Sequence, residues 1–352
     1  MDSRKEHSTH QLPPPPEPKG LKRWQFLLTV FFIIAVTGSV IYYTVDIHAF
    51  HYLLNIRPIA LWGAVFLSLA GIWLDAYRLI IMVRLTKDTL SQKQAMKILF
   101  ANYFFALFTP GATGGPVAQL LLLRRYGIST GKSAVFVLTR TLLSITVMVL
   151  LMPLIFYTEE TFPEAIPYYL PLALFLGLII GIAALLFLIR SKRFLRWSRG
   201  IISIWTSGNL RRKLLRLQTE LAGAAYLFSK NPFELIRLLG LTAASLITSY
   251  SLVPLLFWGI GFPINWLEAL GRMFLLNFLM HFAPTPGGAG IAEGLFIVLF
   301  TDPTPQSIAG IIALVWRILA EYLPFTLGLI AMIQEFGYSY LKEKFWPTSP
   351  KG

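Results

Sequence analysis

Long runs of apolar residues dominate the chain, and short polar segments separate them. Six of these runs are long enough to cross the membrane as a helix, since about 30 Å of hydrocarbon takes about 20 residues. We therefore predict an all-α integral membrane protein with six transmembrane helices. The helices are expected at residues 24–45, 58–83, 132–157, 166–189, 233–259 and 306–333.

Two further apolar regions, residues 95–123 and 268–300, are each interrupted near the middle by Pro and Gly. The shorter arm of each region has roughly 8–10 residues and cannot cross a bilayer. Broken backbone at membrane depth is tolerated only where other helices or a water-filled cavity cover it. We predict two re-entrant helical hairpins; the alternative is a kinked bundle of eight spans.

The charges between the apolar runs predict the orientation. Lys and Arg collect in the N-terminal tail, in the segments at 84–97 and 190–216, and near the C-terminus. The connection at 158–165 has three Glu and no Lys or Arg. Because cytoplasmic loops are rich in Lys and Arg, both termini are expected inside. With six spans and two hairpins, every basic loop lies on the cytoplasmic side. With eight crossings, the basic loops would lie on conflicting sides.

The two interrupted regions have matching surroundings. Asn102 precedes a P-G-x-x-G motif at 110–114 and Arg140 follows, while Asn277 precedes the same motif at 286–290 and Arg317 follows. The matching residues are 175, 176 and 177 positions apart. An odd number of crossings separates the hairpins, so the repeats have inverted topology and the tips approach from opposite faces, as in many transporters. The alternative is that Pro and Gly merely kink ordinary helices.

The domain organisation follows from these patterns. We expect a disordered cytosolic tail at 1–23, one polytopic membrane domain at 24–336 and a cytosolic tail at 337–352. Within the domain, the repeats cover about 58–158 and 233–335, with a basic cytosolic loop at 190–230.

The hairpin tips are the first candidate binding site. Glycine lets backbone amides approach a ligand closely, and the short helix after each tip directs its N–H groups and positive dipole end at it, which suits an anionic head group. Polar residues on the hairpin arms and the Arg of each next span complete the site. The candidate substrate-binding residues are Asn102, Pro110, Gly111, Gly114, Gly115, Gln119, Arg140, Asn277, Pro286, Gly287, Gly288, Gly290, Glu293 and Arg317.

Ionisable residues within spans are costly and therefore functional candidates. Asp75 with Arg78, and Arg317 with Glu321, have helical spacing for ion pairs that are either structural or functional. Arg140 has no acidic residue at such spacing, so we expect it to meet a lipid phosphate or a carboxylate of the other repeat. For Glu293, three residues after Gly290, the sequence allows a helix cap or a proton-coupling site.

The composition excludes or disfavours several classes of function. The chain is 55% apolar with a formal net charge of +14, and its mean hydropathy is +0.63. Residues 190–219 contain nine Lys and Arg and no acidic residue, a pattern that favours anchoring to an anionic leaflet over nucleic-acid binding. With no Cys there is no disulfide or sulfur-bound metal. We expect no enzyme, metal or cofactor.

The tip motifs also carry a family resemblance. Residues 108–116 (FTPGATGGP), 121–129 (LLLRRYGIS) and 284–293 (PTPGGAGIAE) resemble signatures of the lysylphosphatidylglycerol synthase transmembrane-region family, also called flippase-like or UPF0104 proteins. The resemblance implies a bacterial or archaeal cytoplasmic-membrane protein related to proteins that move aminoacylated phospholipid between leaflets. The sequence departs from the pattern after the first tip, at Val117, Ala118 and Gln119. It ends about 15 residues beyond the last span, so no lipid synthesis is expected of it.

The leading hypothesis is therefore flippase-like translocation of a phospholipid or related amphiphile. The alternatives are an ion- or proton-coupled transporter of a small anionic solute, and a non-transporting membrane partner of an envelope-lipid enzyme. The expected partners are membrane lipids with anionic head groups, and no nucleic acid. A second copy of the chain and an envelope-lipid enzyme are further candidate partners.

Overall fold

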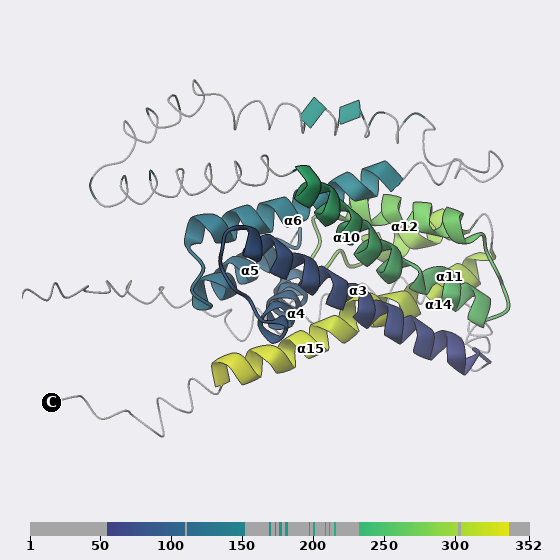
Figure 1. The fold of residues 1–352 in the computed structure, drawn as a ribbon. Helices are drawn as coiled ribbons and strands as arrows, with labels where there is room; N and C mark the ends of the chain where they lie inside the picture. The colour runs from purple at the N-terminus through teal and green to yellow at the C-terminus, as the bar shows by residue number, and fades with distance from the viewer. Residues whose placement is uncertain are drawn as a thin grey trace, which may run out of the picture.

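The computed structural model describes residues 55–109, 111–151, 232–301 and 304–337, together with isolated positions between 169 and 215. Every secondary-structure element of these residues is a helix (Figure 1). Four helical segments within them are long and apolar enough to span a membrane, and they match four of the six predicted spans. These are Pro58–Leu85, Thr130–Leu151, Pro232–Gly259 and Gln306–Glu335.

The other two predicted spans belong to parts of the chain that the structure leaves undescribed. The span at 24–45 lies wholly outside the described residues, as does the N-terminal tail. Only isolated positions of the span at 166–189 and of the basic loop at 190–230 are described. The count of six spans therefore stays a prediction.

The first repeat contains α3 (Pro58–Leu85), α4 (Gln92–Phe108), α5 (Gly114–Arg125) and α6 (Thr130–Leu151). A capping box starts α4, because the Ser91 side chain accepts from the Gln94 N–H and the Gln94 side chain accepts from the Ser91 N–H. Thr109 ends α4 in an extended conformation, φ −116° and ψ 138°. The residue before a proline disfavours the helical conformation.

The second repeat repeats this order. It contains α10 (Pro232–Tyr250), α11 (Leu252–Gly259), α12 (Trp266–Met280), α13 (Ile291–Phe300), α14 (Gln306–Arg317), η4 (Ile318–Tyr322), α15 (Leu323–Met332) and η5 (Ile333–Gly337). The two η elements are π-helical turns within the last helix. Pro324, which has no N–H to donate, is the second residue of α15 and lies two positions after the end of η4. Such turns occur frequently at functional sites.

The first helix of each helix–tip–helix unit packs against the other repeat, whereas its second helix packs within its own repeat. Hairpin 1 is α4, tip 1 (residues 109–113) and α5; hairpin 2 is α12, tip 2 (residues 281–290) and α13. Helix α4 packs against α15, which is part of the last helix of the second repeat (Gln306–Glu335). Helix α12 packs against α6, the last helix of the first repeat. Helix α3 runs beside α10 and α11 (Figure 1). The repeats are therefore interlocked at both hairpins.

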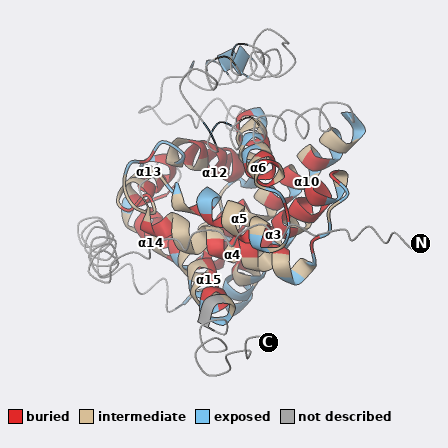
Figure 2. Cartoon of the chain, turned by 90° about the vertical axis from the view of Figure 1, so that its left-hand side faces the viewer, coloured by how far each residue is buried: buried red, intermediate tan, exposed pale blue. Residues whose placement is uncertain are grey.

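Small residues allow close contact between the long helices. A Cβ atom at Gly71 of α3 would overlap the Ser249 hydroxyl of α10, and the Ser245 hydroxyl donates to the Gly71 carbonyl at 2.9 Å. Gly328 of α15 lies in the same way against the Phe100 carbonyl of α4. Helix association in lipid depends on such van der Waals contact and interhelical hydrogen bonds. Burial is concentrated on the inward faces of the helices, as the red segments of Figure 2 show.

Candidate functional site

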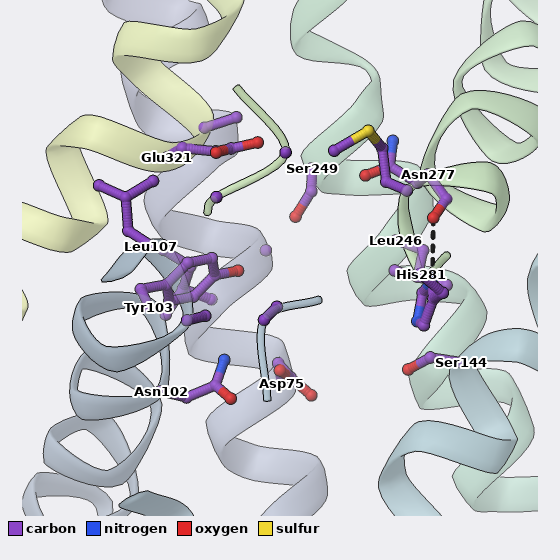
Figure 3. A pocket seen from close by; sticks show the side chains of 18 of the residues that line it. Asp75, Asn102, Tyr103, Leu107, Ser144, Leu246, Ser249, Asn277, His281 and Glu321 are labelled. Carbon is purple, nitrogen blue, oxygen red and sulfur yellow. Dashed lines mark hydrogen bonds between the residues drawn. The ribbon is translucent and has the colours of Figure 1, made fainter. Parts of the chain in front are cut away.

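A cavity of about 470 Å³ lies where the two hairpin tips meet (Figure 3). Its wall comes from α3, α4, α6, α10, α12, the last helix and both tips. The tips are neighbours, because the position of a Cβ on Gly111 is 3.9 Å from the Ala283 carbonyl and Gly287 packs on Leu107. The predicted residues that line the cavity are Asp75, Asn102, Gly111, Arg140, Asn277, Gly287, Gly288 and Glu321.

The other predicted residues lie behind this wall and support it. The Gly114 N–H donates to the Thr109 hydroxyl at 2.7 Å, and a Cβ at Gly115 would overlap the Asn102 side chain. Gln119 is buried in α5, and its Nε2 has no partner among the described residues. Pro110 lies outside them. The residues absent from the cavity wall are Arg78, Gly114, Gly115, Gln119, Pro286, Gly290, Glu293 and Arg317.

Asp75 of α3 binds two arginines. Arg78 donates from Nη2 to Asp75 Oδ1, which confirms the ion pair predicted from their spacing. Arg140 of α6 donates from Nε to Asp75 Oδ2 at 3.1 Å and also from Nη2. The partner of Arg140 is thus a carboxylate of its own repeat, rather than one of the other repeat as the sequence suggested. The contact joins α3 to α6 beside tip 1.

Arg78 is deeper than Arg140 and has a different set of partners. Its Nη1 donates to the Thr242 hydroxyl at 2.7 Å and to the Ser144 hydroxyl at 3.3 Å, so that α3, α6 and α10 are joined. The Arg78 side chain is 2% exposed and that of Arg140 is 16% exposed. Only Arg140 lines the cavity. Arg78 therefore joins three helices and Asp75 within the bundle, whereas Arg140 reaches the cavity.

Arg317 occupies the equivalent position of the second repeat, with more acidic neighbours. Its Nε donates to Glu293 Oε1 at 3.0 Å, its Nη2 donates to the Gly287 carbonyl at 2.9 Å, and its Nη1 pairs with Glu321. The Arg317 side chain is 0% exposed. Glu293 Oε2 accepts from the Gly290 N–H at 2.8 Å, the capping contact that was one of the two alternatives for this residue. Arg317 and Glu293 together fasten tip 2 to the last helix.

Both tips contain left-handed backbone, and they differ at one equivalent position. In tip 2, Gly287 and Gly288 have φ of +57° and +65°. In tip 1, Gly111 has φ of +61°, and Ala112 has φ of +53° where tip 2 has Gly288. An L-residue in this conformation costs roughly 1–2 kcal/mol, so tip 1 is locally strained.

Several residues of the cavity wall were not predicted from the sequence. Tyr103, Ser144 and Ser249 line the cavity, and isolated hydroxyl groups in apolar helices gave no signal for them. Of these three residues, only Ser144 could have been found by aligning the two repeats. It precedes Glu321 by 177 residues, the same separation as between Arg140 and Arg317.

Asn277 and His281 form the polar face of hairpin 2 in the cavity. Asn277 Nδ2 donates to the Met273 carbonyl at 2.9 Å, and the His281 Nδ1 lies 2.8 Å from the Asn277 carbonyl (Figure 3). A carbonyl only accepts, so the His281 Nδ1 is the donor. In the described part of the chain, no three His, Asp or Glu side chains are grouped to hold a metal ion.

Comparisons with known proteins identify the family of the chain. The profile of the lysylphosphatidylglycerol synthase TM region matches residues 26–328. A UPF0104 membrane protein of Archaeoglobus fulgidus is 22% identical over 334 residues, which cover 91% of this chain and 98% of the relative. The profile match spans most of the chain, including both hairpins, three of the four long apolar helices and most of the fourth. The chain therefore belongs to the lysylphosphatidylglycerol synthase TM-region family and is a membrane protein.

Proposed function

We propose that the protein translocates a phospholipid between the leaflets of a cytoplasmic membrane, with the head group held in the cavity between the hairpin tips. The observation that carries the proposal is the composition of the cavity wall. Both tips and helices of both repeats contribute to it, and Arg140, Glu321 and several hydroxyl and amide groups face it within an otherwise apolar helical bundle.

The size and surroundings of the cavity support a lipid head group. Ligand sites typically have volumes of about 300–1,000 Å³, and the cavity has about 470 Å³. The acyl chains would stay among the apolar outer faces, where Phe66, Leu138 and Ile236 are exposed. Arg140 would bind the phosphate, since an arginine fork suits phosphate oxygens. Arg317 and Glu293, which are enclosed, would position tip 2.

The proposal includes a membrane arrangement. Six spans would place both termini in the cytoplasm, and the two hairpins would be re-entrant, with hairpin 1 entering from the cytoplasmic face and hairpin 2 from the opposite face. The packing of α4 on α15 and of α12 on α6 supports this inverted arrangement, because each tip then reaches the shared cavity beside the other repeat. Rocking of one repeat against the other would change the face to which the cavity opens.

Arg140→Ala is expected to slow translocation without unfolding the protein, because Asp75 keeps its ion pair with Arg78. The measurement is leaflet translocation in proteoliposomes that contain fluorescent anionic, zwitterionic and cationic phospholipids. The rate should fall at least about tenfold, the effect of losing one charge-assisted contact of about 1.4 kcal/mol. Arg237→Ala is the matched control, since Arg237 lies outside the cavity wall and pairs with Glu234.

Two outcomes would contradict the lipid translocation. If folded wild-type protein moves none of the lipids but takes up a small anion, the solute-transporter hypothesis is favoured. If Arg140→Ala and Arg237→Ala translocate lipid as fast as wild type, the assignment of the phosphate to Arg140 is wrong.

Glu335→Gln is expected to open the cavity toward the cytoplasm. Glu335 accepts from Lys97 of α4 at 2.6 Å and from Arg125 of α5 at 3.2 Å, so it fastens both arms of hairpin 1 to the end of the last helix. Removal of its charge weakens two partly exposed ion pairs, together worth about 1 kcal/mol, or about fivefold in population.

The chain has no Cys, so a single cysteine at position 112 of tip 1 reports this opening directly. In inside-out vesicles, Glu335→Gln should raise its labelling by a membrane-impermeant maleimide about fivefold. Asp88→Asn is the control, because Asp88 pairs with Lys132 of α6 and does not join hairpin 1 to the last helix. Equal labelling of the two variants would show that the Glu335 contacts do not gate the cavity.

A further inference from the structure

The cavity between the tips is open on one side. Of the described residues that line it, the exposed ones are Ala112, Thr113, Pro116 and His281. These residues belong to tip 1, the start of α5 and tip 2. Val117 directly follows Pro116 and is 57% exposed, and Phe282 directly follows His281 and is 71% exposed. These six residues form the mouth of the cavity.

The matching positions of the second repeat are buried. Pro286 of tip 2 follows Pro110 of tip 1 by 176 residues. In this register, the equivalents of Ala112, Thr113, Pro116 and Val117 are Gly288, Ala289, Ala292 and Glu293, and all four are buried. Both tips have the P-G-x-x-G motif, so the motif does not explain the difference. The start of α5 is open because neighbouring side chains do not cover it as they cover the start of α13.

Leu107, near the end of α4, is one of the residues that cover tip 2. It packs with Ala289, Tyr322 and Phe325 in one apolar cluster. Phe282 is the equivalent of Leu107 in the second repeat, since 175 residues separate the two, as for the asparagines of the two hairpins. Leu107 is 7% exposed and Phe282 is 71% exposed. The cover is therefore formed at tip 2, and its counterpart is not formed at tip 1.

The mouth borders on the cytoplasmic leaflet in the proposed membrane arrangement. Helix α5 runs from tip 1 toward the cytoplasmic face, where Arg124 and Arg125 form its last turn. The mouth lies at the start of this helix, and its largest exposed side chains, Val117 and Phe282, are apolar. Apolar side chains favour contact with hydrocarbon over contact with water. An acyl chain therefore suits the mouth better than an aqueous solute.

We infer that the mouth is a lateral entrance from the cytoplasmic leaflet, where the acyl chains of a lipid remain in the bilayer while the head group enters the cavity, and that Phe282 closes it in the opposite state. This inference rests on the proposed lipid translocation and adds the route of the lipid tails. Inverted repeats can exchange their conformations when access alternates. Phe282 would then cover Thr113 as Leu107 covers Ala289 in this structure.

Two cysteine pairs test the closure, since the chain has no Cys. Leu107→Cys with Ala289→Cys joins the contact of this structure, and Thr113→Cys with Phe282→Cys joins the contact expected in the opposite state. A short bifunctional methanethiosulfonate would link each pair in proteoliposomes, and a reductant would release it. We expect both links to form, the second when the protein visits the opposite state.

Lipid access to the mouth is measured with p-benzoylphenylalanine in place of Val117. On illumination this side chain forms covalent adducts with nearby lipid, which mass spectrometry quantifies. The link between positions 113 and 282 should lower the adduct yield at least about fivefold, because a tether populates the closed state almost completely. The link between positions 107 and 289 should leave the yield unchanged. The same reporter at Val298 of α13, which is exposed and outside the cavity wall, is the matched control and should respond to neither link.

Three results would overturn the inference. The first is an absence of lipid adducts at position 117 in the unlinked protein. The second is a pair at positions 113 and 282 that cannot be linked in folded protein, with Ala112→Cys in place of Thr113→Cys as a second variant. The third is an adduct yield at position 117 that neither link changes.

Failure of the proposed function gives a different result. Lipid would then fail to move in proteoliposomes, although the links still change the adduct yield at position 117 as expected. If lipid translocation is correct and the entrance is as inferred, each link should stop lipid movement and the reductant should restore it. Lipid movement that continues with both links in place would leave the translocation standing and reject the role of Phe282.

Discussion

Replacement of Arg317 by alanine is expected to destabilise the protein by about 3–5 kcal/mol, the effect of removing one partner from a buried ion pair. The substitution leaves Glu293 enclosed without its cation and the Gly287 carbonyl without its donor. Because Glu293 also caps tip 2, the damage should reach the tip backbone. Unfolding by SDS titration in mixed micelles would measure the loss.

Arg140→Ala is the matched comparison, since both arginines occupy the same position of their repeats. Arg140 is partly exposed, and Asp75 retains Arg78 when Arg140 is removed. We expect a loss of stability of about 1 kcal/mol, in the range of partly exposed ion pairs. Equal losses of stability for the two variants would contradict the assignment of a structural role to Arg317 and a ligand role to Arg140.

Gly288→Val is expected to lower the free energy of unfolding by at least about 2 kcal/mol and to stop translocation. Gly288 has φ of +65°, and a left-handed L-residue costs roughly 1–2 kcal/mol, more for a β-branched one. A Cβ at this position would also overlap the Met280 side chain of α12. Tip 2 would have to shift away from the cavity, which both SDS titration and the proteoliposome assay would detect.

Ala112→Gly in tip 1 is the control for the general effect of changing a tip residue. Ala112 already has the left-handed conformation, with φ of +53°, so Ala112→Gly removes strain. It is expected to be neutral or to stabilise the protein by up to about 1 kcal/mol. If Ala112→Gly and Gly288→Val destabilise the protein equally, the left-handed backbone is not the cause.

The elements that rest on local chemistry were predicted well from the sequence. The long apolar helices in the described residues follow from continuous hydrophobicity, and the interruption of α4 follows from Pro110 and the extended Thr109 before it. The register between the repeats also located the two tips that meet at the cavity. The ion pairs Asp75–Arg78 and Arg317–Glu321 were predictable because helical spacing brings such residues together.

Contacts between separate helices were predicted poorly. Arg140 and Asp75 are 65 residues apart, and Arg317 and Glu293 are 24 apart. Periodicity describes which residues share a face of one helix, but it does not state which helix lies opposite. For the same reason, Arg317 was predicted to bind substrate like Arg140, although it is enclosed. The predicted binding residues also included glycines that support a tip from behind the cavity wall.

The sequence by itself determined that the chain is an all-helical membrane protein with two matched hairpins, because hydrophobic length, Pro and Gly act through the local backbone. Only the tertiary structure decided which carboxylate pairs with which arginine. Electrostatic interactions in a poorly solvated interior depend on contact distance and on the exclusion of water. Both are set by which helices pack beside one another, α3 with α6 and α13 with α14, which no pattern along the chain records.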